Sequence, residues 1–591
     1  MGENLERLNA NLKRVEELSQ RLVAALSQRE AGDAGLYGPG QDVYLKAGMA
    51  YWNDLVNNPA KLMERQVQYW GETLTHYMEA QSALASGKLE VAEGQDTPKD
   101  RRFANPLWQT HPYFNFVKQQ YLTSAKAVED AVVDLEGLEG KDKQRVEFFA
   151  RQMIDMFSPT NFLATNPDAL ELAVETDGES LVRGMENLVR DVEKHRGEFL
   201  PTLADPDAFK LGENIGTAEG KVIYRNRMME LIQFAPTTET VHKTPLIIFP
   251  PWINKFYVMD LKPQNSLIRW VVDQGYTLFV VSWKNPDHSY ADTGLEDYIE
   301  DGYLKAFDVA REITGEKQVN AVGYCIAGTT LSLTLSLLKK RGEKPVKSAT
   351  FFTTLVDFSD QGEFTVFLQD DFVDSIERQV EEAGILDSYF MSKTFSYLRA
   401  NDLVYAPAVR SYMMGEAPPA FDLLFWNGDS TNLPGKMVVQ YLRGLCQSNA
   451  LANEGFSLFG ETLHIKDVTV PVCAIACEGD HIAAWKDSYR GVQKMGSKNK
   501  TFLLSQSGHI AGIVNPPSKK KYGHYTNDDL SLPNSQWREG ADFHEGSWWP
   551  RWVEWLAKQS GKQTDARIPG EAGYPALCDS PGTYVMEQPK S

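Results

Sequence analysis

The sequence lacks the short motifs that mark several common kinds of enzyme. Its 591 residues contain no glycine-rich phosphate loop, no HExxH helix and no redox CxxC pair, so motif evidence for P-loop, zinc-protease or thioredoxin-type chemistry is missing. It has only five cysteines, an odd number with no metal-like quartet. We therefore expect no resident cofactor and no metal site, and the cysteine usage fits a reducing, cytoplasmic location.

Two further absences narrow the class of partner. No apolar run is long enough for a membrane-spanning helix, and no signal-peptide segment follows Met1, so we expect neither a membrane span nor export. The formal net charge is −20, without a stripe of lysine and arginine, which argues against a nucleic-acid partner. An anionic ligand would need a local basic patch, for which Lys255 and Lys519–Lys521 are the candidates.

One strand–turn–helix segment carries a cysteine at the nucleophile position of the α/β-hydrolase fold. A β-branched run ends at Gly323, Cys325 follows two residues later, and the small residues Ala327 and Gly328 open a leucine-rich helix. Small neighbours permit the strained backbone of a nucleophile elbow, which exposes the reactive side chain. The pattern predicts that Cys325 replaces the usual serine.

An acid and a histidine follow in the chain order that this fold requires. Asp480 lies just past the apolar run 470–476, and His509 lies on a loop past the strand predicted at 501–504. Since the triad order is nucleophile, acid, histidine, the pattern predicts Cys325, Asp480 and His509 as the catalytic residues. Glu478 is an alternative acid. His481 is an alternative base, but a histidine next to the acid is hard to aim at the nucleophile, which favours a structural role.

Continuous apolar or β-branched runs predict a buried, mostly parallel, doubly wound sheet. Helical stretches separate these runs, which is the pattern of strands covered on both faces by crossover helices. All three candidate residues fall at the carboxyl ends of strands, where such sheets place their sites. The predicted strands that precede the acid are 221–224, 229–232, 246–249, 277–282, 319–322 and 349–356.

The length of the chain predicts two domains. We expect a mainly helical N-terminal domain over 1–213, with a mobile helix over 1–30 ahead of a glycine-rich break near 32–40, and a catalytic domain over 214–591. The insertion 357–466 is rich in aromatic residues and lies between two sheet strands. We expect it to form a cap over the site that excludes water and gates access.

Several stretches together resemble the polyhydroxyalkanoate synthases, specifically the class I type, over most of the chain. One departure is visible, because Ala327 stands where the family commonly has glycine; a methyl group there should tune packing and leave activity intact. The matching stretches are Arg102–Phe103 with Trp108, 250–256, 260–263, 282–286, 323–329, 425–434 and 508–517.

The resemblance implies a polyester synthase that joins (R)-3-hydroxyacyl groups from coenzyme A (CoA) thioesters and releases CoA. By motif match Cys325 is the acylated nucleophile, His509 the general base and Asp480 its partner, which either fixes the imidazole tautomer or helps to activate the incoming hydroxyl. The resemblance also implies short acyl chains, with 3-hydroxybutyryl-CoA as the expected substrate. It further implies a homodimer, and a location on polyester granules with granule-associated partners.

The tetrahedral oxyanion formed on the substrate needs two hydrogen-bond donors. On this fold one is the backbone N–H after the nucleophile, here Ile326, and the other comes from the loop after an early strand. That loop begins with two prolines, which have no N–H, so Ile253 or Asn254 is the expected second donor. Two other functions stay open from the residues alone: a cysteine-dependent thioesterase or ester hydrolase on the same fold, and a non-catalytic granule-associated protein.

Overall fold

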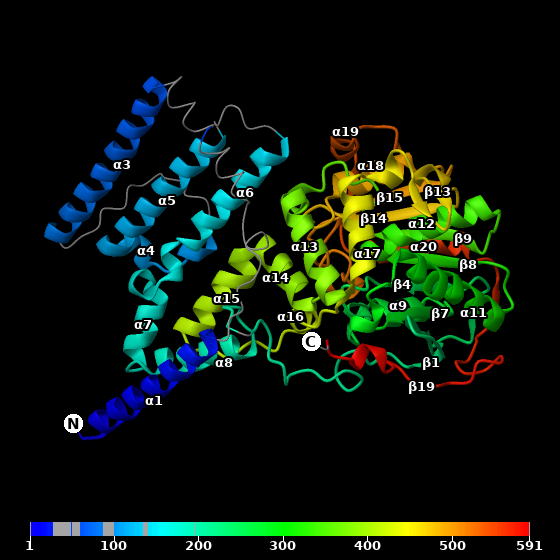
Figure 1. The fold of residues 1–591 in the computed structure, drawn as a ribbon, viewed down its shortest axis with the longest axis horizontal. Coiled ribbons are helices and arrows are strands. Elements are labelled where there is room, and N and C mark those ends of the chain that lie inside the picture. The colour runs from blue at the N-terminus through cyan, green and yellow to red at the C-terminus, as the bar shows by residue number, and fades with distance from the viewer. Residues whose placement is uncertain are drawn as a thin grey trace. The chain divides into compact units, whose positions relative to one another are not determined.

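The computed structural model describes residues 2–27, 49, 59–86, 100–133, 140–195 and 197–589 (Figure 1). The chain forms two compact units. The first contains residues 1–205 and 393–419, and the second contains residues 206–392 and 420–591. Part of the predicted cap insertion thus packs within the N-terminal unit. The gating role of the insertion stays a prediction, and the break expected near residues 32–40 lies outside the described residues.

The N-terminal unit is built of helices, as the spacing of its apolar residues predicts. Helix α1 packs along α8, where Leu18 is buried and Arg21 forms an ion pair with Glu193 at 2.7 Å. The expected mobility of α1 stays a prediction. The α-helices of this unit before the insertion are α1 (Gly2–Leu26), α3 (Pro59–Ser86), α4 (Leu107–Thr110), α5 (Pro112–Val133), α6 (Gly140–Met156), α7 (Pro167–Glu175) and α8 (Glu179–Lys194).

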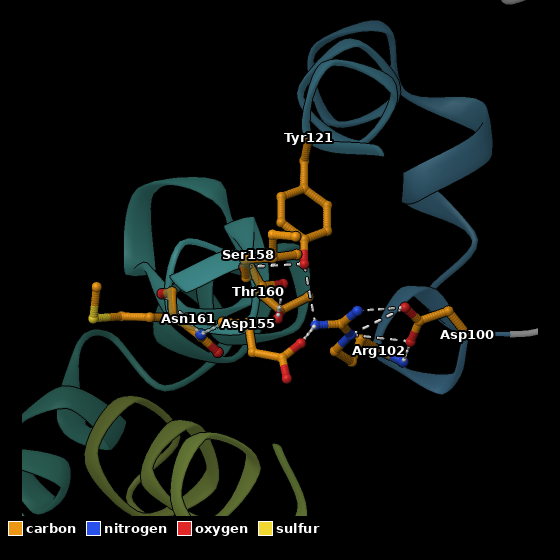
Figure 2. A network of polar contacts seen from close by, with 9 residues as sticks. Asp100, Arg102, Tyr121, Asp155, Ser158, Thr160 and Asn161 are labelled. Atoms are coloured by element: carbon orange, nitrogen blue, oxygen red, sulfur yellow. Dashed lines mark hydrogen bonds and ion pairs between the residues drawn. The ribbon is translucent and has the colours of Figure 1, made fainter. Parts of the chain in front are cut away.

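A polar network around Arg102 ties three segments of this unit together (Figure 2). The guanidinium donates to both carboxylate oxygens of Asp100, to Asp155 Oδ1 at 3.1 Å and to the Tyr121 hydroxyl at 3.2 Å. Tyr121 lies on α5 and Asp155 on α6. Beside the network, Phe103 packs edge-on against the fully buried Trp108. The Arg102–Phe103 and Trp108 positions are therefore structural, because they hold helices to one another.

The second unit contains an eleven-stranded sheet. Its six central strands, β15 to β7 in the order below, are parallel, and antiparallel strands flank them at both edges. The order across the sheet is β17 (Asp542–His544), β16 (His524–Thr526), β15 (Lys500–Ser505), β14 (Val472–Cys477), β9 (Val346–Phe352), β8 (Val319–Tyr324), β4 (Leu246–Phe249), β7 (Leu278–Trp283), β2 (Met229–Phe234), β1 (Gly220–Arg225) and β19 (Cys578–Asp579).

Helices cover both faces of this sheet, which explains why its central strands are continuously apolar. On one face, Val280 and Phe352 share a core with residues of α9 and α20. On the other, Phe249 stacks on Tyr303 and contacts Phe307 of α11. The main helices of the sheet unit are α9 (Leu267–Asp273), α11 (Lys305–Thr314), α12 (Ile326–Arg341), α18 (Trp485–Lys494), α19 (Asn534–Glu539) and α20 (Trp549–Gln559). The predicted doubly wound α/β fold is confirmed.

The insertion between β9 and β14 is mainly helical. Its α-helices are α13 (Asp370–Ala383), α14 (Ser388–Leu398), α15 (Ala406–Ala408), α16 (Asp422–Asn427) and α17 (Gly435–Val439). Two short strand pairs accompany them, β10 (Ile385–Leu386) with β11 (Leu433–Pro434) and β12 (Phe456–Leu458) with β13 (Glu461–Leu463). Across the described ranges, no helix has the length and apolar character needed to cross a membrane.

Candidate active site

Cys325 occupies a strained turn between β8 and α12. Its backbone has φ 55° and ψ −125°, a conformation that costs a residue with a side chain about 1–3 kcal/mol. The turn requires small neighbours: a Cβ on Gly323 would lie 2.5 Å from Gly328 Cα, and one on Gly328 would lie 2.0 Å from Thr354 Oγ1. The thiol is partly exposed. These features are those of a nucleophile elbow.

Ala327, which stands where the resemblance leads one to expect glycine, lies directly after this turn. The residue is fully buried in the first turn of α12, and its carbonyl accepts a hydrogen bond from the Tyr303 hydroxyl at 2.6 Å. The glycine that the close packing does require is the next residue, Gly328. An added Cβ at Gly328 would collide with Thr354, and it is Gly328 that has to be glycine.

The structure brings Asp480 and His509 together. They lie on the loops that follow the adjacent parallel strands β14 and β15, and His509 Nδ1 is 2.7 Å from Asp480 Oδ2. The other carboxylate oxygen, Oδ1, accepts the N–H groups of Ile482 and Ala483, both at 2.9 Å. Because the acid side chain is fully buried and bonded through both oxygens, it holds the imidazole in one orientation.

The surroundings of His509 favour its charged form. Burial by itself lowers the pKa of this histidine, but the charges of Asp480 and Cys325, and hydrogen bonds with both side chains, raise the pKa well above its usual value. Nδ1 faces Asp480, which leaves Nε2 for the thiol. The arrangement suits an imidazolium that stabilises a thiolate.

Three aromatic residues that the sequence analysis did not identify hold the His509 loop in place. The hydroxyl of Tyr324, the residue before Cys325, donates to the His509 carbonyl at 3.2 Å. The indole N–H groups of Trp548 and Trp549 donate to the carbonyls of Gly512 and Ile513, each at 2.8 Å. The adjacent tryptophans were visible as a sequence feature, but their partners, 36 residues away, were not.

The alternative acid is placed elsewhere. Glu478 forms an ion pair with Arg538 at 2.9 Å, while Asp480 is the carboxylate that contacts His509. Within the ranges that the structure covers, no group of three or more histidine, cysteine, aspartate or glutamate side chains has the geometry to hold a metal ion.

The candidate oxyanion donors lie on two segments. Ile326 is the first residue of α12, and its N–H is one of the four that a helix N-terminus leaves without an intrahelical partner. Ile253 and Asn254 follow β4 on a loop that is bonded to the segment 429–431. There the Ile253 carbonyl accepts the Thr431 N–H at 3.0 Å, and the Asn254 amide donates to Ser430 Oγ at 3.3 Å.

The interpretation of Lys255 as an anion-binding residue is wrong. Its side chain is buried and forms an ion pair with Asp429 at 2.7 Å, and the Tyr257 hydroxyl donates to the same carboxylate at 2.8 Å. A buried ammonium group whose charge is compensated by a neighbouring carboxylate presents no net positive charge to a ligand. Its contact instead fastens the loop after β4 to the insertion.

Comparison with known proteins shows which family this chain belongs to. A family model described as "Poly-beta-hydroxybutyrate polymerase (PhaC) N-terminus" matches residues 99–271, and one described as "alpha/beta hydrolase fold" matches residues 244–516. The chain is 41% identical over 538 residues to the poly(3-hydroxyalkanoate) polymerase of Methylorubrum extorquens, covering 90% of this chain and 87% of that one. The chain belongs to the poly(3-hydroxyalkanoate) polymerase family.

Two further polymerases of the family support this membership. The PhaC subunit of Cupriavidus necator is 40% identical over 534 residues, covering 89% of this chain and 88% of that one. That of Rhizobium etli is 38% identical over 582 residues, covering 97% and 91%. The predicted polyester synthase, an acyltransferase on the α/β-hydrolase fold, is confirmed, and the family assignment disfavours both the hydrolase and the non-catalytic alternatives.

Proposed function

We propose that this polymerase joins (R)-3-hydroxyacyl groups from CoA thioesters through an acyl-enzyme on Cys325, with His509 as base and Asp480 as its partner. One observation carries the proposal: a partly exposed cysteine in a strained elbow and a buried Asp480–His509 pair, 2.7 Å apart, share the carboxyl edge of one parallel sheet. A thiol suits this substrate, because attack on a thioester yields another thioester and keeps the acyl group activated.

In the first half-reaction the Cys325 thiolate attacks the thioester carbonyl carbon. The tetrahedral intermediate then collapses, its carbon–sulfur bond to CoA breaks, and the leaving thiolate takes a proton from the His509 imidazolium. This step is supported by the raised pKa of His509, to which the charge of Cys325 contributes.

In the second half-reaction the 3-hydroxyl of another acyl unit attacks the Cys325 thioester. Neutral His509 takes the hydroxyl proton, an ester bond forms, and the cysteine leaves as a thiolate. The polymer grows by one unit in each such cycle. Of the two roles left open for Asp480, orientation of the imidazole is favoured, because its oxygens are occupied by His509 Nδ1 and two backbone N–H groups.

The oxyanion of each tetrahedral intermediate would accept hydrogen bonds from the Ile326 N–H and from the N–H of Ile253 or Asn254. This assignment is supported by the position of Ile326 at the start of α12 and by the anchoring of the other loop to the segment 429–431. A fixed donor stabilises the developing charge without having to reorganise during the reaction.

The finer expectations rest on the resemblance to the class I synthases. They are a short-chain substrate such as 3-hydroxybutyryl-CoA, a homodimer, and a cytoplasmic location on the polyester granule with granule-associated partners. No cofactor is proposed, since the thioester supplies an activated acyl group and the proposed steps need only proton transfer.

The decisive experiment measures CoA release from (R)-3-hydroxybutyryl-CoA by purified wild type and Cys325→Ala, with the acyl product sized in the same samples. The proposal predicts thiol release together with high-mass polyester, both lost in the variant. Release of free 3-hydroxybutyrate alone would identify a hydrolase. Release that persists in Cys325→Ala would remove the cysteine from the mechanism.

A further inference from the structure

A short loop rich in lysine is fastened to the loop that carries His509. The two ends of the segment 515–523 are clamped by the Asn515 side chain, which donates to the Tyr522 carbonyl at 3.0 Å. Gly523, the residue after Tyr522, makes two hydrogen bonds with Gln506. The Gln506 N–H donates to the Gly523 carbonyl, and the Gly523 N–H donates to Gln506 Oε1, both at 2.9 Å. The lysine loop is therefore held beside the catalytic histidine loop.

The three lysines of this loop, Lys519, Lys520 and Lys521, are exposed. In the described part of the chain, no carboxylate lies within ion-pairing distance of their ammonium groups. Lys521 Nζ lies 4.9 Å from the centre of the Tyr522 ring. No described carboxylate therefore compensates the charges of these lysines, in contrast to the buried Lys255, which is paired with Asp429.

The positive field of the loop reaches the edge of the active site. Hydrogen bonds from Lys521 and Ser507, together with the charges of Lys521 and Lys519, lower the pKa of the Tyr522 phenol. Ser507 is two residues before His509 on the same loop. A local cationic region thus adjoins the site in a chain whose formal net charge is −20.

We propose that Lys519, Lys520 and Lys521 form the binding site for the phosphate groups of the acyl-CoA substrate. This inference rests on the proposed function and adds a location for the anionic end of that substrate. The phosphates lie far along the carrier from the thioester, so a site on a loop beside His509 can hold them without taking part in the chemistry. Ammonium groups suit this task, because they bind phosphate as mobile point charges.

A site of this kind contributes binding that does not change between substrate and transition state. Its loss should raise KM and leave kcat unchanged. It should also make KM for acyl-CoA depend on ionic strength, since exposed charges are screened by salt. A structural role for the loop would instead affect every substrate alike.

The test compares two thioesters of the same acyl group: (R)-3-hydroxybutyryl-CoA, and the corresponding pantetheine thioester, which lacks phosphate. Each of two variants removes three positive charges, one from the lysine loop and the other from elsewhere on the sheet unit. The loop variant is Lys519→Gln/Lys520→Gln/Lys521→Gln, and the matched control, at exposed lysines elsewhere in the sheet unit, is Lys498→Gln/Lys558→Gln/Lys562→Gln.

The proposal predicts that KM for the CoA thioester rises about tenfold in the loop variant, if the three charges each contribute like an exposed ion pair. The kcat, the KM for the pantetheine thioester and both constants of the control variant stay unchanged. An equal rise for both thioesters, or an equal rise in the control variant, would overturn the proposal.

Calorimetric binding of free CoA separates this proposal from the proposed reaction, because it needs no turnover. Weaker CoA binding in the loop variant alone would support the site, even if the wild type failed to make polymer. Inorganic pyrophosphate is the probe for a free anion. If pyrophosphate bound as tightly as CoA, the loop would be a general anion site and the assignment to the substrate would fail.

Discussion

Two cysteines at the same edge of the sheet have opposite environments. Cys325 follows β8 in a turn with positive φ and is partly exposed. Cys477 ends β14, two strands away across the sheet, and is fully buried. Burial raises the pKa of Cys477 well above the usual value of a thiol, and the nearby charge of Asp480 raises it further.

The difference shows that backbone position, rather than residue type, separates the proposed nucleophile from a packing residue. The Cys477 sulfur packs so closely on the chain that a Cβ on Gly512 would lie 2.4 Å from it. Cys325 is turned out of the sheet by the elbow, into the range of His509. A thiol becomes useful where a partner stabilises its anion.

The largest expected contrast is in turnover. Cys325→Ala should lower kcat at least about 10⁴-fold, because the proposed reaction loses its covalent acceptor. Cys477→Ala should leave kcat within about threefold and lower the free energy of unfolding by about 1–2 kcal/mol, the cost of a small cavity. CoA release and urea unfolding of both variants measure these effects. Comparable loss of kcat in the two variants would erase the proposed distinction.

The next contrast is in reactivity toward iodoacetamide. In the native protein Cys325 should be alkylated at least about a hundredfold faster than Cys473 or Cys477, because the latter pair are buried with raised pKa values. Peptide mass analysis at timed intervals gives the three rates. Unfolding in urea is the control and should bring the rates together; faster labelling of Cys477 in the native state would contradict the account.

His509→Gln should reduce the difference in alkylation rate between Cys325 and the two buried cysteines, and the size of this reduction should depend on pH. The raised pKa keeps the His509 imidazole charged near neutral pH. Removing this charged partner should slow Cys325 alkylation at pH 7 about 30-fold, since an unassisted thiol is only a few per cent ionised there. The ratio of the Cys325 alkylation rate in wild type to that in His509→Gln should fall as pH rises past about 8.5, where an ordinary thiol ionises by itself. Rates from pH 6 to 10 test this, and a constant ratio would argue against a thiolate–imidazolium pair.

Changing the elbow without touching the thiol should give a smaller effect. In Gly328→Ala the new Cβ would lie 2.0 Å from Thr354 Oγ1, so we expect about 2–3 kcal/mol less free energy of unfolding and slower alkylation of Cys325. Adding Thr354→Ala should restore part of the lost free energy of unfolding and part of the lost alkylation rate of Cys325. Gly71→Ala in α3 is the control, because nothing lies within 4 Å of its new Cβ. If this variant lost as much free energy of unfolding and alkylation rate, the effect of Gly328→Ala would not come from the elbow.

Much of the sheet was predictable because its central strands are buried on both faces. The runs at 246–249, 319–322 and 501–504 lie within β4, β8 and β15, since continuous apolar segments between helices admit few other structures. The short antiparallel strands β16, β17 and β19 were missed. They are two or three residues long and carry polar side chains, so local pattern does not distinguish them from loops.

The candidate site also has a part that was predictable from the sequence and a part that was not. The placement of Cys325, Asp480 and His509 just past strands was predictable from the order of the apolar runs, and Asp480 and His509 lie 2.7 Å apart in the structure. Their catalytic roles stay predictions. The support from Tyr324 and Trp548, and the burial of Lys255 against Asp429, depend on contacts between residues far apart in the chain. Nothing in local spacing encodes such contacts, so they require the fold.

The central claim is that the growing acyl chain is carried on Cys325. The most direct measurement is peptide mass analysis of wild type, acid-quenched during turnover of (R)-3-hydroxybutyryl-CoA. The account predicts a thioester-linked 3-hydroxybutyryl or oligomeric adduct on the peptide that contains Cys325, removed by hydroxylamine, and none on the peptide that contains Cys477. An adduct on Cys477 or on a serine, or polymer formed with no covalent adduct, would contradict it.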